Sequence, residues 1–264
     1  MIHAMRLGMI LLLMVACAAR GELLVSSFNN NQVLRFDPAT GAFLGTLVSN
    51  AVVLAPHETV FAFDRALYVA SANNDRVLRV SPASGDVLAT LPTIGVPLDY
   101  PAGMTLGEDG LLYVSSQLND SVLRYDATNG AFLDTFVAPG SGGLDGPSGL
   151  AFGPDGDLYV AGRFADRVFR YSGADGAFLD IFVTNALSQP FGLRFGPDGH
   201  LYVANGNSNH VARFDGSSGA FLGIFTSGGA LSLPIGLAFG PDTNLYVASF
   251  GGDTVARFDG HTGA

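Results

Sequence analysis

The 264-residue sequence contains no lysine and no tryptophan, and its only cysteine is Cys17. All 13 basic residues are therefore arginines, and the 23 acidic residues bring the formal net charge to −10. The absence of lysine excludes Schiff-base chemistry and a phosphate-binding P-loop lysine. A single cysteine excludes an intrachain disulfide. Because binding to phosphates requires a local positive excess, we also expect no nucleic-acid partner.

Charged residues of both signs are scarce, whereas glycine is abundant. Charged residues make up 14% of the chain, against a usual ~25%, and the 35 glycines are nearly twice the usual share of ~7%. Hydrophobic residues make up 48%, which is enough to form a core and excludes intrinsic disorder. The excess glycine indicates many tight turns, because glycine accepts positive φ without strain.

The segment 1–21 has a composition of its own. A basic residue precedes a mostly apolar run from Leu7 to Cys17, and small residues follow as far as Ala18. This order is typical of a secretory signal peptide, and the run is shorter than the ~20 residues of a membrane-spanning helix. We predict a bacterial protein that is secreted or located in the periplasm or cell envelope, without a membrane span. A buried or membrane-anchoring N-terminal helix is the alternative.

The end of this segment allows two forms of processing. The sequence Met14-Val15-Ala16-Cys17 resembles a bacterial lipoprotein box in which methionine replaces the usual leucine. If this box is used, Cys17 carries a lipid anchor. Ordinary cleavage after Ala18, which the small-residue pattern favours, leaves a mature chain without cysteine.

A repeated motif of the form L-(Y/L)-V-(A/S) determines the architecture. It occurs six times at intervals of 43 to 46 residues, beginning at Leu23, Leu67, Leu112, Leu158, Leu201 and Leu245. Each copy continues with V-x-R-(F/Y/V), a polar turn and a short apolar run, and most are preceded by P-x-G-(L/M) and a GPDG-type turn. These short runs of β-branched and aromatic residues between turns predict four strands per unit. Four strands in about 44 residues is the period of a propeller blade.

We therefore predict an all-β fold: a six-bladed β-propeller of four-stranded blades spanning residues 22–264. The chain begins with the second strand of the first unit, near 22–48, and ends in a turn after the third strand of the last unit, near 255–258. We accordingly expect an incomplete seam at the C-terminus. The last blade would lack its outer strand, and the first blade its inner strand.

The repeat P-x-G-L-A-F-G-P-D-G-x-L-Y-V-A, followed by V-x-R-F, resembles the NHL repeat over residues 22–264. The resemblance implies a six-bladed propeller related to streptogramin B lyases, gluconolactonases and peptidyl-hydroxyglycine lyases. In such propellers ligands usually bind over the central channel, on the side of the loops between the second and third strands. Fold alone does not settle function.

Most of the repeated polar residues have a structural interpretation. We expect the aspartates of the GPDG turns to cap backbone groups rather than to bind calcium, since no D-x-D-x-D-G loop occurs. One loop position carries Asn or Asp in all six units, which indicates a turn device, with a ring of ligand acceptors as the alternative. The repeated strand arginines are expected to pack between blades and bond turn carbonyls, with anion binding as the alternative. These residues are Asp155, Asp198 and Asp242; Asn31, Asp75, Asp120, Asp166, Asn209 and Asp253; and Arg35, Arg79, Arg124, Arg170, Arg213 and Arg257.

Positions that vary between the units are the candidate ligand-binding residues. They are the middle residue of P-x-G, the residue that replaces its glycine in one unit, and the first variable residue of the loop between the second and third strands. The predicted ligand-binding residues are Phe28, His57, Glu58, Gln117, Ser148, Arg163, Phe191, Ile235 and Phe250.

His57 and Glu58 form the one local anomaly in the repeat. A histidine beside a carboxylate can act as an acid/base pair or contribute to a metal site, although neighbours on a strand point to opposite faces. The resemblance to gluconolactonases implies that Glu58 could match a metal-binding glutamate at the start of an inner strand, with calcium or magnesium as the ion. His200, His210 and His261 lie elsewhere in the repeat, so a three-histidine zinc site is not supported.

The sequence favours a non-catalytic binding or interaction scaffold that recognises a protein, peptide or saccharide, without cofactor. The alternative is a metal-assisted lyase or lactonase centred on His57 and Glu58. Convergence of Glu58 with two further Asn, Asp or His side chains would favour the enzyme. A mouth lined by Phe28, Phe191, Ile235 and Phe250 would favour the scaffold.

Overall fold

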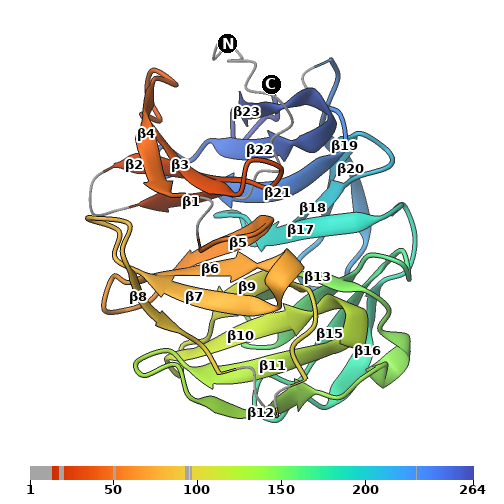
Figure 1. Ribbon diagram of the computed structural model, residues 1–264. Helices are drawn as coiled ribbons and strands as arrows, with labels where there is room; N and C mark the ends of the chain where they lie inside the picture. Colours follow the sequence, from red (N-terminus) through yellow and green to blue (C-terminus); the bar gives the residue numbers. More distant parts are fainter. Residues whose placement is uncertain (1–13, 18–20, 50–51, 93–94, 96, 230) are drawn as a thin grey trace.

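Six antiparallel sheets surround a central axis in the computed structural model, which describes residues 14–17, 21–49, 52–92, 95, 97–229 and 231–264 (Figure 1). Within each sheet the strands follow chain order from the axis outward. The predicted six-bladed β-propeller is confirmed.

Each blade is defined by its strands, which alternate with short turns along the chain. Blade 1 comprises β1 (Met14–Cys17), β2 (Glu22–Ser27), β3 (Gln32–Phe36) and β4 (Phe43–Val48). Blade 2 comprises β5 (Pro56–Phe61), β6 (Leu67–Ser71), β7 (Arg76–Val80) and β8 (Val87–Thr90). Blade 3 comprises β9 (Pro101–Leu106), β10 (Leu111–Ser116), β11 (Ser121–Asp126) and β12 (Phe132–Val137). Blade 4 comprises β13 (Pro147–Phe152), β14 (Leu158–Gly162), β15 (Arg167–Tyr171) and β16 (Phe178–Val183). Blade 5 comprises β17 (Pro190–Phe195), β18 (Leu201–Asn205), β19 (His210–Phe214) and β20 (Phe221–Ser227). Blade 6 comprises β21 (Pro234–Phe239), β22 (Leu245–Ser249) and β23 (Thr254–Phe258).

Burial along a blade explains why the second strand is the most regular part of the repeat. All five residues of β6, β14, β18 and β22 are buried, because neighbouring blades cover both faces of the strand. Outer strands face solvent instead, and pairs such as Phe221 and Leu222 are exposed at their start. Near-continuous apolar runs are expected for strands covered on both faces.

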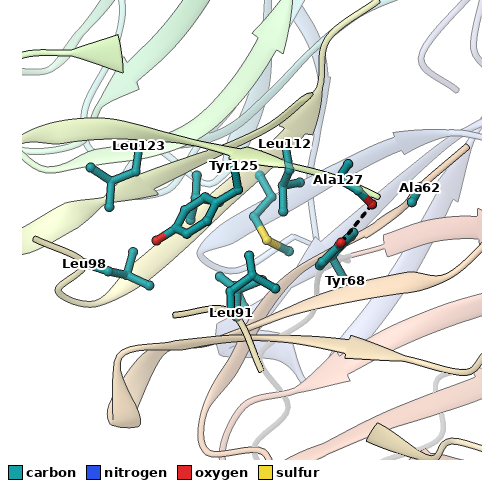
Figure 2. Close-up of a cluster of buried hydrophobic side chains, with 12 residues drawn as sticks. Ala62, Tyr68, Leu91, Leu98, Leu112, Leu123, Tyr125 and Ala127 are labelled. Atoms are coloured by element: carbon teal, nitrogen blue, oxygen red, sulfur yellow. Dashed lines mark hydrogen bonds between the residues drawn. The ribbon is translucent and has the colours of Figure 1, made fainter. Parts of the chain in front are cut away.

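The core consists of clusters between adjacent blades rather than one central mass. Figure 2 shows the cluster between blades 2 and 3, where Tyr68, Leu112, Leu123 and Tyr125 pack together. The Tyr68 hydroxyl donates a 2.9 Å hydrogen bond to the carbonyl of Ala127, so the polar end of this buried ring is satisfied. Contacts of this kind join each blade to the next, as in other repeat proteins.

The first blade differs from the sequence-based expectation. Strand β1 pairs antiparallel with β2, with Met14 opposite Val25 and Cys17 opposite Glu22. It lies between the inner strands of blades 6 and 2, contacting β21 and β5, and completes the ring of inner strands around the axis. The expectation that blade 1 lacks an inner strand was wrong: β1 comes from the segment assigned to a leader, without a P-x-G motif to mark it. Blade 6 has three strands, as expected.

The predicted leader, residues 1–21, lies mostly outside the described residues, as does the cleavage position at Ala18. Its removal therefore stays a prediction, and cleavage there would take β1 with it. Among the described residues, no helix is both long and apolar enough to cross a membrane.

Candidate functional site

The propeller has two rims of different construction. The turn rim is formed by the GPDG-type turns and by the turns between third and outer strands. The channel mouth is formed by the loops between second and third strands and by the residues at which the inner strands begin. The predicted ligand-binding residues belong to the mouth or to the adjoining inner strands.

On the turn rim, the recurrent aspartates stabilise the turns. Asp109, Asp155, Asp198 and Asp242 each accept a hydrogen bond of 2.8–3.0 Å from the tyrosine hydroxyl of the following L-Y-V motif. Their other oxygen accepts the amide two residues later in the turn. The structure supports the interpretation of these residues as turn devices.

The recurrent arginines also serve the frame, but through different partners from those expected. Arg35 makes a bidentate ion pair with Glu22 at 2.7 and 2.8 Å, and Arg124 makes another with Asp134 at 2.6 and 3.1 Å. The expected bonds to turn carbonyls were wrong for Arg124, whose partner is a carboxylate. Carboxylates on the neighbouring strands face the same side and satisfy the guanidinium fork better than a carbonyl does.

At the mouth, the recurrent Asn and Asp residues join adjacent blades. All six adopt the left-handed conformation, and in blades 1 to 5 the Oδ1 accepts the amide of the residue before the next inner strand. The five bonds, of 2.6–2.9 Å, run from Ala55 to Asn31, from Tyr100 to Asp75, from Gly146 to Asp120, from Gln189 to Asp166, and from Leu233 to Asn209. These residues therefore act as turn residues, and each bond also fixes where the next inner strand begins.

Glu58 forms an ion pair inside the channel rather than at its mouth. It occupies the place of Gly103 and Gly149, where the inner strands pack so closely that a Cβ would meet the backbone of the next blade. Its side chain is only 2% exposed, and its Oε1 binds Nη2 of Arg194. Oε2 accepts the amide of Met104 at 3.2 Å.

The partner, Arg194, comes from the opposite side of the ring. Glu58 lies on β5 of blade 2 and Arg194 on β17 of blade 5, three blades away (Figure 1). Nη1 of Arg194 also donates to the carbonyls of Leu150 and Leu193, at 3.1 and 2.8 Å. Burial raises the pKa of Glu58, while the guanidinium and the Met104 amide oppose that shift. Both carboxylate oxygens are therefore engaged.

His57 lies between two aromatic rings instead of beside a carboxylate. The ring centroids of Phe28 and Tyr100 are each 5.4 Å from that of His57, in edge-to-face geometry. Its Nε2 is 3.4 Å from the Tyr100 hydroxyl. Burial, with the positive charge of Arg163 as a smaller cause, lowers the pKa of His57 to about 3. The imidazole is therefore neutral and a weak base at neutral pH.

Four of the predicted residues come together as an apolar cluster. Phe191 and Ile235 are buried, and Phe28 and Phe250 pack against them with Leu233. The cluster brings together residues from blades 1, 5 and 6. This is the lining that the sequence analysis associated with a binding scaffold.

The remaining predicted residues divide into two kinds. Ser148 is buried, and its hydroxyl lies 3.0–3.2 Å from the carbonyls of Ala161, Pro190 and Phe191, so it serves the contact between blades 4 and 5. Gln117 and Arg163 lie in equivalent loops, and each has a nitrogen that is buried without a hydrogen-bond partner. The Arg163 guanidinium lies over the rings of Phe164 and Phe191, at 5.1 and 4.3 Å.

The donor set around His57 and Glu58 does not fit a divalent metal. Glu58 is bound by a cation and an amide, and His57 is enclosed by aromatic rings. Among the described residues, no three His, Cys, Asp or Glu side chains gather in a way that could hold an ion. No catalytic step through a metal is derived for this pair.

Residues 54–263 match the model of the Virginiamycin B lyase family. The chain belongs to this family. The match covers more than half of the sequence and begins just before the inner strand of blade 2. No curated protein matches the chain at the level of sequence.

Solved structures similar to this member of the Virginiamycin B lyase family share its fold. A catalytically inactive histidine-to-alanine variant of virginiamycin B lyase from Staphylococcus aureus with quinupristin is 16% identical, with a TM-score of 0.72 over 96% of this chain and 82% of that one. A gluconolactonase from Xanthomonas campestris is 20% identical, with a TM-score of 0.76 over 94% and 85%. An auxiliary nutrient binding protein from Bacteroides thetaiotaomicron is 12% identical, with a TM-score of 0.73 over 94% and 68%.

Two of the residues that shape this site escaped the sequence analysis. Arg194 replaces the small residue found at Ala151 and Ala238, and this departure from the repeat was its only signal. Tyr100 precedes the proline of its inner strand, where the other units carry unrelated residues. Neither residue stands in the positions that were compared between units.

Proposed function

We propose that this member of the Virginiamycin B lyase family is a non-catalytic binding protein that takes up an apolar, peptide-like ligand at the channel mouth. The single observation that carries the proposal is the state of Glu58. Its carboxylate is buried and bound on both oxygens, by Arg194 from the opposite blade and by the Met104 amide. A carboxylate held in this way is not free to accept a proton from a ligand or to hold an ion.

The surroundings of His57 support the same conclusion. A general base works best with a pKa near the working pH, and the pKa of His57 lies well below it. The side chains nearest to it are Phe28 and Tyr100, which can pack against a ligand but do not orient the imidazole for proton transfer as a carboxylate would. His57 is therefore assigned to the wall of the binding site.

The apolar cluster supplies the attraction. The half-buried rings of Phe28 and Phe250 present aromatic surface, and the buried Phe191 and Ile235 pack beneath them, as in the apolar lining of many ligand sites. Among the solved relatives, one is described as a nutrient binding protein and another is seen with quinupristin. A peptide-like ligand suits such a surface better than a saccharide, which would need many hydrogen-bonding side chains.

We place the protein outside the cytoplasm, on the basis of the leader-like segment 1–21, with Cys17 as the site of a lipid anchor if the lipoprotein box is used. The intact mass of the protein from a bacterial host decides between these forms. Cleavage after Ala18, lipidation of Cys17 and an unprocessed chain give three different masses.

Calorimetric titration with quinupristin and with N-acetyl-phenylalanyl-phenylalaninamide tests the binding function. We expect saturable binding of at least one of them, weakened about tenfold by Phe250→Ala because a buried ring contributes roughly 1.5–3 kcal/mol. The exposed Phe221→Ala, on the outer strand of blade 5, is the matched control and leaves the affinity unchanged. Failure of both probes to bind would contradict the proposal.

Family membership favours a second candidate, a lyase whose activity depends on His57 and Glu58. Chromatography of quinupristin after long incubation, with and without calcium or magnesium, separates the two candidates. The binding function predicts unchanged quinupristin. Conversion that disappears in both His57→Ala and Glu58→Gln would establish the lyase instead.

A further inference from the structure

The channel mouth also carries polar side chains next to its apolar cluster, and the Arg163 guanidinium lies 4.3 Å from the ring centroid of Phe191. We call Tyr100, Gln117 and Arg163 the donor arc. Gln117 lies on η2 (Gln117–Asn119) of blade 3, and its backbone N–H donates to the backbone carbonyl of Tyr100 at 3.2 Å. Arg163 occupies the equivalent loop position of blade 4. Burial raises the pKa of the Tyr100 phenol, and the positive charge of the nearby Arg163 opposes that rise. Tyr100 thus has Arg163 and the backbone of Gln117 as neighbours, and Gln117 and Arg163 come from adjacent blades.

The donor arc contains donors that the protein itself does not use. Nε of Arg163 and Nε2 of Gln117 are buried, and neither has a hydrogen-bond partner among the described residues. Arg163 also forms no ion pair with a carboxylate in that part of the chain. Buried donors in folded proteins are nearly always paired, so two unpaired donors in adjacent blades call for an acceptor.

The acidic residues of the same loops are committed elsewhere. Asp75, Asp120 and Asp166 each give Oδ1 to a backbone amide at the start of the next inner strand. By contrast, the strand arginines Arg35, Arg124 and Arg170 have carboxylate partners. Arg163 thus differs in its environment from these arginines, because its neighbours are two phenyl rings.

We propose that the ligand is an amphiphilic monoanion, whose carboxylate binds the donor arc while its apolar body covers Phe28, Phe191, Ile235 and Phe250. The inference rests on the proposed binding function and adds the chemical class of the ligand. A guanidinium fork matches a carboxylate, and the neutral Gln117 and Tyr100 donors add hydrogen bonds without adding charge. One cation balances one negative charge, which favours a monoanion over a doubly charged phosphate.

A matched pair of probes tests the role of the carboxylate. N-acetyl-phenylalanyl-phenylalanine carries the carboxylate, and its C-terminal amide has the same apolar body without the charge. By calorimetry at low ionic strength, we expect the acid to bind at least about tenfold more tightly than the amide, since hydrogen bonds to charged groups are roughly twice as strong as neutral ones. The preference should shrink with added salt.

Variants locate this preference on the donor arc. Arg163→Gln is expected to abolish the preference for the acid, and Gln117→Glu to weaken binding of the acid while sparing the amide. Arg167→Gln removes an exposed charge near the same loop and should change neither affinity. Thermal melting of each variant checks that the fold is intact.

The outcomes separate the two proposals. If acid and amide bind equally at a site that Phe250→Ala weakens, the binding function stands and the carboxylate inference is overturned. If the preference for the acid persists in Arg163→Gln, the donor arc is not its cause and the inference is again overturned. If neither the acid nor the amide binds, the carboxylate inference is overturned, and the binding function then stands only if quinupristin binds.

Discussion

The two rims of the propeller use charge differently. On the turn rim, Arg35, Arg124 and Arg170 meet carboxylates on nearby strands, and the recurrent aspartates meet tyrosine hydroxyls. At the mouth and in the channel, Glu58, Arg194 and Arg163 are charged residues at positions where the other units carry uncharged ones. Glu58 and Arg194 join blades that are not neighbours in the ring, whereas Arg163 has no carboxylate partner among the described residues. The recurrent arginines thus stabilise single blades, the recurrent Asn and Asp residues of the mouth join neighbouring blades, and the unrepeated Glu58 and Arg194 join opposite sides of the ring.

The largest effect is expected where an unrepeated charge loses its partner. Arg194→Ala leaves the Glu58 carboxylate buried without a counter-ion, and removing one partner of a buried pair costs about 3–5 kcal/mol. Urea denaturation measures the free energy of unfolding. The double variant Glu58→Gly/Arg194→Ala restores the residues of other blades and should recover most of the loss. A double variant as unstable as the single one would show that packing, not charge, is responsible.

A smaller loss is expected from a repeated mouth residue. Asp166→Ala removes the acceptor of the 2.6 Å bond from the Gln189 amide and places alanine at a φ of 53°. We expect a loss of about 1–2 kcal/mol in unfolding free energy. Asp166→Asn keeps the acceptor, as Asn31 and Asn209 do in blades 1 and 5, and should be nearly neutral. Equal losses in both variants would mean that the inter-blade bond is unimportant.

His57 predicts a dependence of stability on pH at the mouth. Its pKa is about 3 in the folded protein and near 6.5 in the unfolded chain, so the unfolded state binds the proton first. The contribution is present above pH 6.5 and is lost as the pH falls from about 6.5 to about 3. Since His57 is partly exposed, we expect about 1–2 kcal/mol between pH 7 and pH 4.5. His57→Gln should lose this part of the pH dependence. If the unfolding free energy of the variant changed with pH as that of the wild type does, His57 would not be its cause.

The smallest effect is expected on the turn rim. Arg170 pairs with Asp180 at 2.5 Å, but the side chains are 26% and 44% exposed. Exposed ion pairs contribute about 0–1 kcal/mol, so Arg170→Ala should change the unfolding free energy by less than about 1 kcal/mol. Asp180→Asn is the companion variant. If either change approached the effect of Arg194→Ala, the contrast between repeated and unrepeated charges would not hold.

The architecture could be predicted from the sequence because each unit carries its own local signals. The turn residues, the L-Y-V strand and the strand arginine recur at nearly equal intervals, and each describes structure within about 44 residues. The Glu58–Arg194 pair could not be read in this way, because its members are 136 residues apart. Comparing all departures from the repeat by charge, rather than one loop position at a time, would have marked both residues.

The inner strand of blade 1 shows the opposite limit. Met14–Cys17 lacks the P-x-G-L motif and is part of an apolar run that also has the pattern of a leader. Pairing with β2 is local, whereas the contacts with β21 and β5 that place this segment in the ring join residues far apart in the sequence. An apolar run does not show by itself whether it is a secretion signal or a strand that packs in the fold.

The bonds from Asn and Asp at the mouth have a consequence for how this protein could change. Each one fixes the backbone just before the proline of the next inner strand, and the residue after that proline carries His57, Phe191 or Ile235. The residue whose backbone is held by the Asn or Asp bond therefore differs from the nearby residue whose side chain faces the ligand site. A substitution at a recognition residue leaves its backbone support in place, so new ligand preferences can arise one blade at a time while the ring stays closed.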